Sequence, residues 1–409
     1  MKILVLDAYF EPEQTAFTHL EKDLLDAFVQ AGHEIEIVCP TPSRGIDDIT
    51  AKKYSAVKKE SLYGGKVNVT RFYAPKEGKN SFFRALRYFW CNFRLYRTAK
   101  RIKGADVLFS NSTPPVQGLV AAKLKKKLKI PFVYDLQDVF PDSLSGAGLA
   151  KKGSLSFKIG NKIADKIYAA ADKIIVISED FKKNIIAKGV PENKIEVVYN
   201  WVDTDSVRPV PREDNRLFDE LDIDRDLFTV VYAGNFGKAQ GVKVVFDAAK
   251  LLKERKDIRF VLFGGGAEYE DLKKFGEQNG IDNLLLFPLL GQDRVSEVYG
   301  LGSVNLITCK KGFGGSSLPS KTWSIMACDL PIIASYDKDS ELAKVLQDSG
   351  AGITVEPEDP AALAKAIIAF KDSPFNVSAR QYVLRNADKK LCVKKYVDVV
   401  EAAVGKVEK

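Results

Sequence analysis

Short apolar runs alternate with helical patterns along the whole chain, and this alternation limits the fold more than any other feature. In the first half the runs lie at residues 2–9, 33–40, 105–112, 131–138, 171–179 and 195–203. In the second half they lie at 229–234, 259–266, 284–290, 303–308, 331–335 and 351–355. Such continuous runs are typical of parallel strands that are covered by helices on both faces. The pattern predicts an α/β protein with two doubly wound sheets.

A polar segment with two prolines, residues 206–216, separates the two series of apolar runs. Such a segment is typical of a link between domains. We therefore predict an N-terminal Rossmann-like domain over residues 1–205 and a C-terminal one over 206–379, facing each other across a cleft. Residues 380–409 have the pattern of one or two amphipathic helices.

Composition narrows the class of protein. No apolar run approaches the roughly 18–20 residues that cross a bilayer, and the chain enters a strand pattern at once, without a signal peptide. Five scattered cysteines and only two histidines argue for reduced thiols in a cytoplasm and against a zinc site. Up to residue 205 there are 33 basic and 24 acidic residues, against 29 and 30 beyond. We expect the first half to meet an anionic surface or substrate.

The stretch 229–252 combines an apolar run, a glycine-rich loop and the start of a helical pattern. This order lets backbone N–H groups and the helix dipole face an anion. We interpret the loop as a phosphate cradle; the alternative is an ordinary strand-to-helix turn. The loop positions assigned to the ligand are Gly234, Asn235, Gly237, Lys238 and Gln240.

A second loop, rich in glycine and serine, lies within 312–335 and precedes a helical pattern with Lys321 in its first turn. A cation there opposes the helix dipole and costs roughly a few tenths of a kcal/mol unless an anion offsets it. A bound diphosphate would supply the offset; the alternative is a flexible loop with a surface lysine. The positions of this segment assigned to the ligand are Ser316, Ser317, Leu318, Pro319, Ser320 and Ser324. A weaker junction of strand, glycine and helix contains Gly264 and Gly265.

Acidic residues follow several apolar runs. Asp138 ends such a run in the first half, where a doubly wound sheet presents its ligand crevice. Pairs of the form D-x-D begin at positions 203, 222, 224 and 337, and carboxylates together with a substrate phosphate can hold a divalent cation. Most of these pairs lie in or near the link, so we interpret them as solvated loop acids and expect no metal.

The segment 80–103 contains no acidic residue, and its aromatic and basic side chains are interspersed. Such a helix suits an anionic membrane interface, and the lysines of 123–129 add to it if they lie nearby. The alternative is that the aromatic side chains pack on the protein's own sheet. Single-stranded nucleic acid also meets such surfaces, but no nucleic-acid module accompanies this one, so we expect no nucleic-acid partner. The residues assigned to the membrane or acceptor are Arg84, Arg87, Trp90, Arg94 and Arg97.

Several motifs together resemble the GT-B glycosyltransferases of the large retaining family 4. The similar segments are MKILVLDAYFEPE with GHEIEIV, IPFVYDLQDVFPDSL, ADKIIVIS with NKIEVVYNWVD, and VVYAGNFGKAQGV. The wording AGNxG, LPSK and NWVD resembles bacterial surface-polysaccharide transferases of the colanic acid or N-acetylfucosamine type. The resemblance covers nearly the whole chain.

This resemblance implies a retaining transfer of a hexosyl or N-acetylhexosaminyl group from a nucleotide sugar of the UDP-linked kind to a lipid-linked or saccharide acceptor, without metal or other cofactor. It implies that the base lies near Pro288 and Leu289, that Asp138 and Gln137 line the cleft, and that Lys321 holds the diphosphate. The C-terminal helices would pack back on the first domain. The protein would work in the cytoplasm, peripherally at the inner face of the membrane.

Four sets of positions depart from the wider family. Asn235 and Gln240 replace an Arg and a Lys of the phosphate loop, and Ser316 and Ser324 replace a glutamate pair. Gln137 replaces a histidine, and residues 14–16 (Gln, Thr, Ala) replace a double glycine. Lys238 and Lys321 are candidates to replace the missing positive charge. Two other functions share the architecture. One is an epimerase or hydrolase of UDP-sugars, and the other is a non-catalytic partner that binds nucleotide sugar, which the missing glutamates favour.

Overall fold

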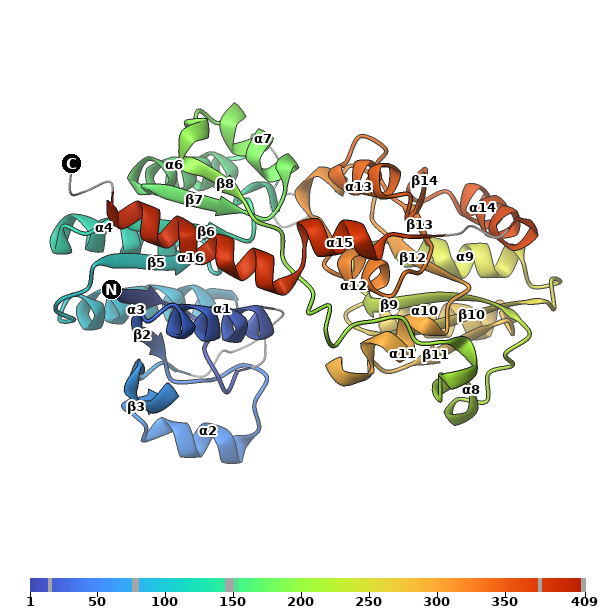
Figure 1. Ribbon diagram of the computed structural model, residues 1–409, viewed down its shortest axis with the longest axis horizontal. Coiled ribbons are helices and arrows are strands. Elements are labelled where there is room, and N and C mark those ends of the chain that lie inside the picture. The colour runs from blue at the N-terminus through green and yellow to red at the C-terminus, as the bar shows by residue number, and fades with distance from the viewer. Residues whose placement is uncertain (14–16, 76–80, 144–150, 152, 374–376, 406–409) are drawn as a thin grey trace. The chain divides into compact units, whose positions relative to one another are not determined.

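The computed structural model describes residues 1–13, 17–75, 81–143, 151, 153–373 and 377–405, with only the backbone at 81–85. The chain divides into two compact units, Met1–Tyr199 with Cys392–Lys409, and Asn200–Leu391. Each unit is built on one sheet with helices on both faces, as the apolar runs predict (Figure 1). The division falls slightly before the predicted boundary at 205/206. At the C-terminal end of the chain, only the segment from Cys392 belongs to the first unit. The C-terminal segment that packs on the first unit is therefore shorter than the predicted 380–409.

The first unit has an eight-stranded sheet in the order β3-β4-β2-β1-β5-β6-β7-β8. All neighbours are parallel except the β3–β4 pair. β1 pairs with β2 on one side and β5 on the other, so the winding reverses between β1 and β5. The strands are β1 (Lys2–Leu6), β2 (Glu34–Pro40), β3 (Lys59–Leu62), β4 (Val67–Phe72), β5 (Val107–Asn111), β6 (Phe132–Leu136), β7 (Lys173–Val176) and β8 (Ile195–Val197).

Helices cover both faces of this sheet. α3 (Ser81–Ala99), α4 (Gln117–Leu128), α6 (Leu155–Ala170) and α7 (Glu179–Ala187) share one apolar core with it. On the other face α1 (Thr18–Gln30) and α16 (Lys389–Gly405) lie in front of the strands in Figure 1. Serine side chains start two of these helices: Ser154 accepts from Phe157 N at 3.3 Å, and Ser178 from Phe181 N at 3.1 Å.

One part of the first unit has no counterpart in the predicted elements. α2 (Asp48–Ser55), β3 and β4 extend the sheet beyond β2. β3 is an antiparallel edge strand of sequence KESL without a buried residue. Because such a strand carries no continuous apolar run, the pattern of hydrophobic residues does not reveal it.

The second unit has a six-stranded, fully parallel sheet in the order β11-β10-β9-β12-β13-β14. Its winding reverses between β9 and β12, the counterpart of β1 and β5 in the first unit. In doubly wound sheets, ligands bind outside the carboxyl ends of the strands at such a reversal. The strands are β9 (Phe228–Asn235), β10 (Ile258–Gly265), β11 (Leu284–Phe287), β12 (Val304–Thr308), β13 (Ile332–Ser335) and β14 (Gly352–Val355).

The helices of the second unit are short apart from α14. α9 (Lys243–Leu251), α10 (Tyr269–Gln278) and α14 (Pro360–Asp372) share a core with one face of the sheet. α11 (Val295–Gly300), α12 (Lys321–Ala327) and α13 (Glu341–Ser349) pack against β9, β12 and β14 respectively. The remaining elements are α8 (Leu217–Glu220), α15 (Arg380–Asn386) and the short 3-10 turns η1 (Tyr63–Gly65), η2 (Glu192–Lys194), η3 (Arg212–Asp214), η4 (Lys238–Gln240), η5 (Gln292–Arg294) and η6 (Gly314–Ser316).

A buried hydrogen bond ties the C-terminal helix to the first sheet. The hydroxyl of Tyr396 in α16 donates to Asp135 Oδ1 in β6 at 2.9 Å, and Gln137 Nε2 donates to the same hydroxyl at 3.3 Å. The C-terminal helix therefore contributes to the interior of the unit that the N-terminus begins. In the described part of the chain, no helix is both long enough and apolar enough to cross a bilayer.

Replacing Tyr396 with phenylalanine should lower the free energy of unfolding of the first unit by about 1–3 kcal/mol, because the buried Asp135 loses a hydrogen-bond donor. Urea unfolding of the full chain measures this change. Tyr73→Phe is the matched control, since Tyr73 is 63% exposed. Equal stability of Tyr396→Phe and the wild type would show that this hydroxyl does not fasten α16 to the sheet.

Candidate functional site

The loops after β9 and β12 are bonded to each other at the reversal point of the second sheet. From Asn235 the first loop runs through η4 into α9. Thr308 Oγ1 donates to Gln240 O at 2.7 Å, and Lys310 N donates to Ala239 O at 2.9 Å. The two glycine-bearing segments, which are far apart in the sequence, therefore lie side by side where this fold binds ligands.

Lys321 supplies the positive charge at this place. Its Nζ lies 4.1 Å from the centroid of the Tyr232 ring, whose face attracts a cation. The same Nζ lies so close to Gly234 that a Cβ on that residue would collide with it. Gly234 also has a φ of +153°, a conformation that favours glycine. This contact explains why the penultimate residue of β9 is a glycine.

The ammonium of Lys321 has no acidic partner among the described residues. Part of the side chain reaches solvent, yet the loss of hydration around the ammonium lowers the pKa of Lys321 from 10.5 to about 7. Burial without a compensating carboxylate disfavours the charged form of a lysine. The site is therefore a cation without an acidic partner among the described residues, and it lies beside the backbone of Gly234.

Glycines of the neighbouring strand shape the same loop. Phe236 N donates to Gly265 O at 2.7 Å, at the end of β10. A Cβ on Gly264 would meet the Phe236 ring and would lie 2.6 Å from Gly234 O. The sequence-predicted pair Gly264 and Gly265 thus lies next to the loop and lets it approach the sheet.

The glycine- and serine-rich loop before α12 is held from the end of β13. The Asp337 carboxylate accepts from Gly312 N at 3.0 Å and from Gly314 N at 2.7 Å. The Tyr336 hydroxyl donates to Ser317 O at 2.8 Å. Asp337 is therefore a structural acceptor and not the solvated acid that the D-x-D pattern suggests. In the part of the chain that the structure describes, no three His, Cys, Asp or Glu side chains converge on a possible metal position.

The other residues that the sequence assigns to the ligand lie at different distances from Lys321 and Gly234. Asn235 Nδ2 donates to Gln240 Oε1 at 3.4 Å, so these two side chains contact each other within the loop. Leu318 is buried, whereas Lys238 is exposed. Pro319 and Ser320 precede α12, which begins at Lys321 and contains Ser324. Pro288 and Leu289 follow the edge strand β11, two strands and hence about 10 Å from β9.

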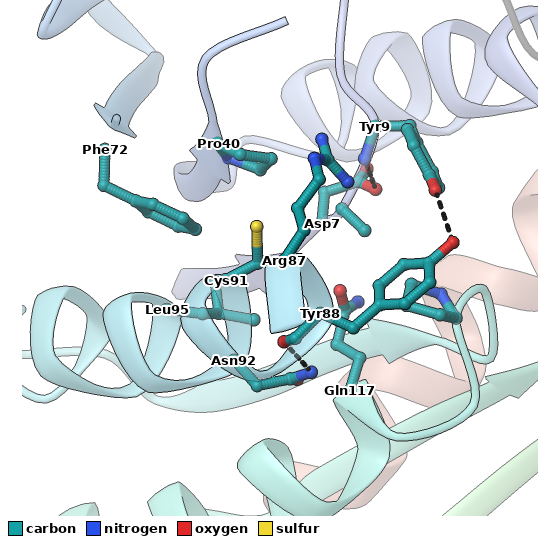
Figure 2. Close-up of a pocket in the computed structure, with 12 residues that line it drawn as sticks. Asp7, Tyr9, Pro40, Phe72, Arg87, Tyr88, Cys91, Asn92, Leu95 and Gln117 are labelled. Atoms are coloured by element: carbon teal, nitrogen blue, oxygen red, sulfur yellow. Dashed lines mark hydrogen bonds between the residues drawn. The ribbon is translucent and has the colours of Figure 1, made fainter. Parts of the chain in front are cut away.

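At the reversal point of the first sheet, acidic and amide side chains surround a small pocket (Figure 2). Asn111 Nδ2 donates to Asp7 Oδ1 at 3.5 Å, and Gln117 Nε2 donates to Leu6 O at 2.8 Å. Across the pocket the hydroxyls of Tyr9 and Tyr88 are 3.3 Å apart. The cavity has a volume of about 20 Å³, which is enough for a water molecule.

Asp7 belongs to a buried pair of carboxyl groups that the sequence analysis does not identify. Its side chain is hydrogen-bonded to Glu21 of α1, and both residues are buried. Burial raises the pKa of Asp7, and burial together with the neighbouring Asp7 raises the pKa of Glu21 well above its ordinary value. Both shifts favour the protonated form of these carboxyl groups. Its sequence signal is the acid that ends the first apolar run, the same signal that singles out Asp138.

The predicted pair Gln137 and Asp138 follows β6 and is held by Ser112, whose Oγ accepts from the two backbone N–H groups at 2.9 and 3.1 Å. Gln137 Nε2 donates to both carboxyl oxygens of Asp135, at 2.9 and 3.1 Å. Burial raises the pKa of Asp135 to about 7 and also raises the pKa of Asp138. Gln137 thus supports a buried carboxyl group, and Asp138 is the partly exposed acid of this strand end.

The basic, aromatic segment forms α3, whose two sides differ. Phe89, Trp90 and Phe93 are 81%, 40% and 53% exposed, and Arg94 lies over the Trp90 ring at 5.5 Å. Arg97 lies over the Phe93 ring, also at 5.5 Å.

For Arg87 the expectation of a membrane-facing side chain is wrong. Its guanidinium is buried and donates to Pro75 O at 2.8 Å and to Ser43 Oγ at 2.7 Å. It lines the small pocket of Figure 2 instead. The Arg84 side chain and the departures at 14–16 lie outside the described residues.

Known proteins with similar sequences identify the class of protein. Residues 22–206 match the family model of Glycosyltransferase Family 4, and residues 213–390 match that of Glycosyl transferases group 1. The two matches meet within the predicted link. The chain is 30% identical to the probable glycosyltransferase WbjE of Pseudomonas aeruginosa over 273 residues, 66% of this chain and 67% of that protein. It is 27% identical over 416 residues to the putative colanic acid biosynthesis glycosyl transferase WcaI of Escherichia coli, covering 97% and 99%.

Solved structures share the fold over the whole chain. A sucrose-phosphate synthase from Thermosynechococcus elongatus superposes with a TM-score of 0.77 at 15% identity, covering 99% of both chains. HepE from Anabaena, solved in complex with UDP and glucose, has a TM-score of 0.72 at 15% identity, covering 98% of this chain and all of its own. The fold is that of the GT-B glycosyltransferases. This chain belongs to glycosyltransferase family 4.

Replacing Gly264 with alanine should destabilise the second unit by about 1–3 kcal/mol, because the added methyl group displaces the Phe236 ring. For a unit of this size we expect the unfolding temperature to fall by about 2–4 °C per kcal/mol, as measured by scanning calorimetry. Gly265→Ala is the matched control, since a Cβ there meets no atom within 4 Å. Similar unfolding temperatures for the two variants would contradict the proposed packing.

Proposed function

We propose that the protein is a retaining glycosyltransferase that moves a hexosyl or N-acetylhexosaminyl group from a UDP-sugar to a lipid-linked or saccharide acceptor. The observation that carries the proposal is the Lys321 ammonium, which lies against Gly234 without an acidic partner among the described residues. A diphosphate beside it would compensate the charge that the protein leaves uncompensated.

The surroundings of Lys321 suit a phosphate group. The absence of a side chain at Gly234 lets the Lys321 ammonium lie against the end of β9, and α9 begins directly after the loop. HepE, a structural relative of the whole chain, has been solved with UDP and with UDP-glucose. These features support a nucleotide-sugar donor on the second unit.

In the proposed reaction the bond between the sugar and the diphosphate breaks, and negative charge develops on the departing phosphate oxygen. Lys321 and backbone N–H groups around Gly234 would stabilise this charge. Such stabilisation is worth about 3 kcal/mol for one well-placed donor. Because a lysine supplies the positive charge, we propose that the transfer needs no metal ion.

The first unit is proposed to bind the acceptor. It carries the excess of basic residues, and Asp138 lies at the carboxyl end of β6, where its carboxyl group is available to a bound hydroxyl. The similarity to WcaI, named for colanic acid biosynthesis, supports an acceptor in bacterial surface polysaccharide synthesis. We further propose that Trp90, Arg94 and Arg97 bring this unit to the anionic inner face of the cell membrane.

A non-catalytic role as a nucleotide-sugar-binding partner is the second candidate. Ser316 and Ser324 stand where the family has glutamates, which favours this role. Release of UDP from UDP-sugars, measured with and without a lipid-linked acceptor, separates the two. Acceptor-dependent release supports transfer, acceptor-independent release supports a hydrolase, and no release with any donor supports the binding partner.

Replacing Lys321 with methionine should weaken UDP binding by about 10- to 150-fold at pH 7, the range expected for the loss of a hydrogen bond to a charged group. In the wild type, a bound diphosphate raises the lowered pKa of Lys321, so binding takes up a proton above pH 7. UDP affinity should then fall as the pH rises above about 7, by up to tenfold per unit. In Lys321→Met this pH dependence should be absent.

Titration calorimetry in two buffers of different ionisation enthalpy measures both the affinity and the proton uptake. Lys243→Met is the control, because Lys243 is already paired with Asp247 at 2.7 Å and should keep the pH dependence. Unchanged UDP affinity in Lys321→Met would refute the diphosphate assignment.

Chelation should leave the transfer rate unchanged, since Lys321 takes the place of a cation in the proposed mechanism. The measurement is the rate of UDP release with acceptor before and after dialysis against EDTA. Loss of activity that Mg²⁺ or Mn²⁺ restores would show that a metal ion is required after all.

A further inference from the structure

An apolar groove runs between α3, α4 and α6 on one face of the first unit. It has a volume of about 770 Å³, within the range of about 300–1,000 Å³ that is usual for small-molecule sites. Side chains from all three helices form its walls, and most of them are apolar or aromatic. Among them are Phe89, Phe93, Tyr96, Leu119, Val120 and Ile163.

The apolar lining continues onto the exposed surface of the helices. Leu155 and Ile159 lie at four-residue intervals before Ile163 on α6, so all three fall on one side of that helix. Leu155 is 75% exposed and Ile159 is 51% exposed. Phe89 and Phe93 have the same four-residue spacing on α3. A continuous exposed apolar patch of this kind marks an interaction site.

The three helices that form the groove carry almost only positive charge. The three helices contain eleven Lys and Arg residues and one acid, Asp165. Lys123 lines the groove, and Lys158 and Lys162 are exposed on α6. None of these three lysines forms an ion pair within the described part of the chain. The groove therefore offers hydrocarbon walls with an uncompensated cationic rim.

We propose that this groove binds one anionic lipid, with its hydrocarbon chain between α3, α4 and α6 and its phosphate beside Lys123. Apolar walls match the chain, and the basic rim matches the head group. The identification of this lipid as the acceptor rests on the proposed function. The binding of its hydrocarbon chain in the groove does not. In this proposal the groove holds the hydrocarbon chain of one lipid molecule. This mode of binding differs from the contact of α3 with the surface of a membrane.

A chain-length series tests this directly. We would titrate the full-length protein with octyl, decyl and dodecyl phosphate below their critical micelle concentrations, using calorimetry. Affinity should rise by up to about fourfold for each methylene that enters the groove. Inorganic phosphate should not bind detectably, and dodecyltrimethylammonium, which has the same chain with a positive head, should bind at least tenfold more weakly than dodecyl phosphate.

Two variants locate the binding. Leu119→Gln places an amide in the wall and should weaken dodecyl phosphate binding at least tenfold. Leu251→Gln is its matched control, since Leu251 is 58% exposed on α9 of the second unit and should bind like the wild type. Lys123→Glu changes an exposed residue and should weaken dodecyl phosphate while leaving dodecanol unaffected. All variants should have the same unfolding temperature and the same UDP affinity as the wild type. Equal values verify that the fold is intact.

Equal affinity of Leu119→Gln and Leu251→Gln for dodecyl phosphate would overturn the proposal, as would an affinity independent of chain length. A third outcome would also overturn it: the wild type and Leu119→Gln bind anionic liposomes equally well, and neither binds dodecyl phosphate. The protein would then contact a bilayer surface and not a single lipid. Transfer assays are read separately. Chain-dependent binding without any sugar transfer would refute the proposed function and leave the lipid groove standing.

Discussion

The electrostatics of Lys321 are the constraint on which the second unit depends. Its ammonium is enclosed between the Tyr232 ring and Gly234, and no carboxylate compensates it among the described residues. The pKa of Lys321 therefore falls to about 7. A ligand that brings negative charge restores the charged form, so binding energy and protonation are linked at this lysine. The same contact accounts for Gly234, because a side chain there would occupy the position of the ammonium.

Both units place polar groups at the ends of their strands, but with opposite electrostatics. In the second unit the loops after β9 and β12 meet near a lysine ammonium that lies against Gly234. In the first unit the ends of β1 and β6 carry buried carboxyl groups, including Asp7 and Asp135, whose pKa values are raised by burial. The strand ends of the second unit thus carry a lysine without an acidic partner among the described residues. In the first unit, burial raises the pKa values of the carboxyl groups at the strand ends, and Asp138 among them is partly exposed.

The sequence predicts much of this fold because strand, turn and helix signals are local. The apolar runs correspond to β1, β2 and every strand from β5 to β14, and the acid-free segment forms α3. The pattern misses α2, which has no buried residue, and β3, an exposed edge strand without an apolar run. It also misses β4, VNVTRF, in which polar residues interrupt the apolar ones. It also misjudges side chains whose surroundings come from elsewhere. Arg87 is buried by Ser43 and Pro75, and Asp337 is bonded to glycines of the preceding loop.

Taken alone, the sequence determined the two parallel sheets, the glycine loops and the concentration of positive charge in the first half. Those features follow from residue types at short spacing, and short spacing is what periodicity and turn chemistry report. Only the tertiary structure decided that Lys321 lies against Gly234, that Tyr396 bonds to Asp135, and that three helices enclose an apolar groove. Each of these contacts joins segments far apart in the chain, and packing between elements, not local propensity, sets which side chains meet.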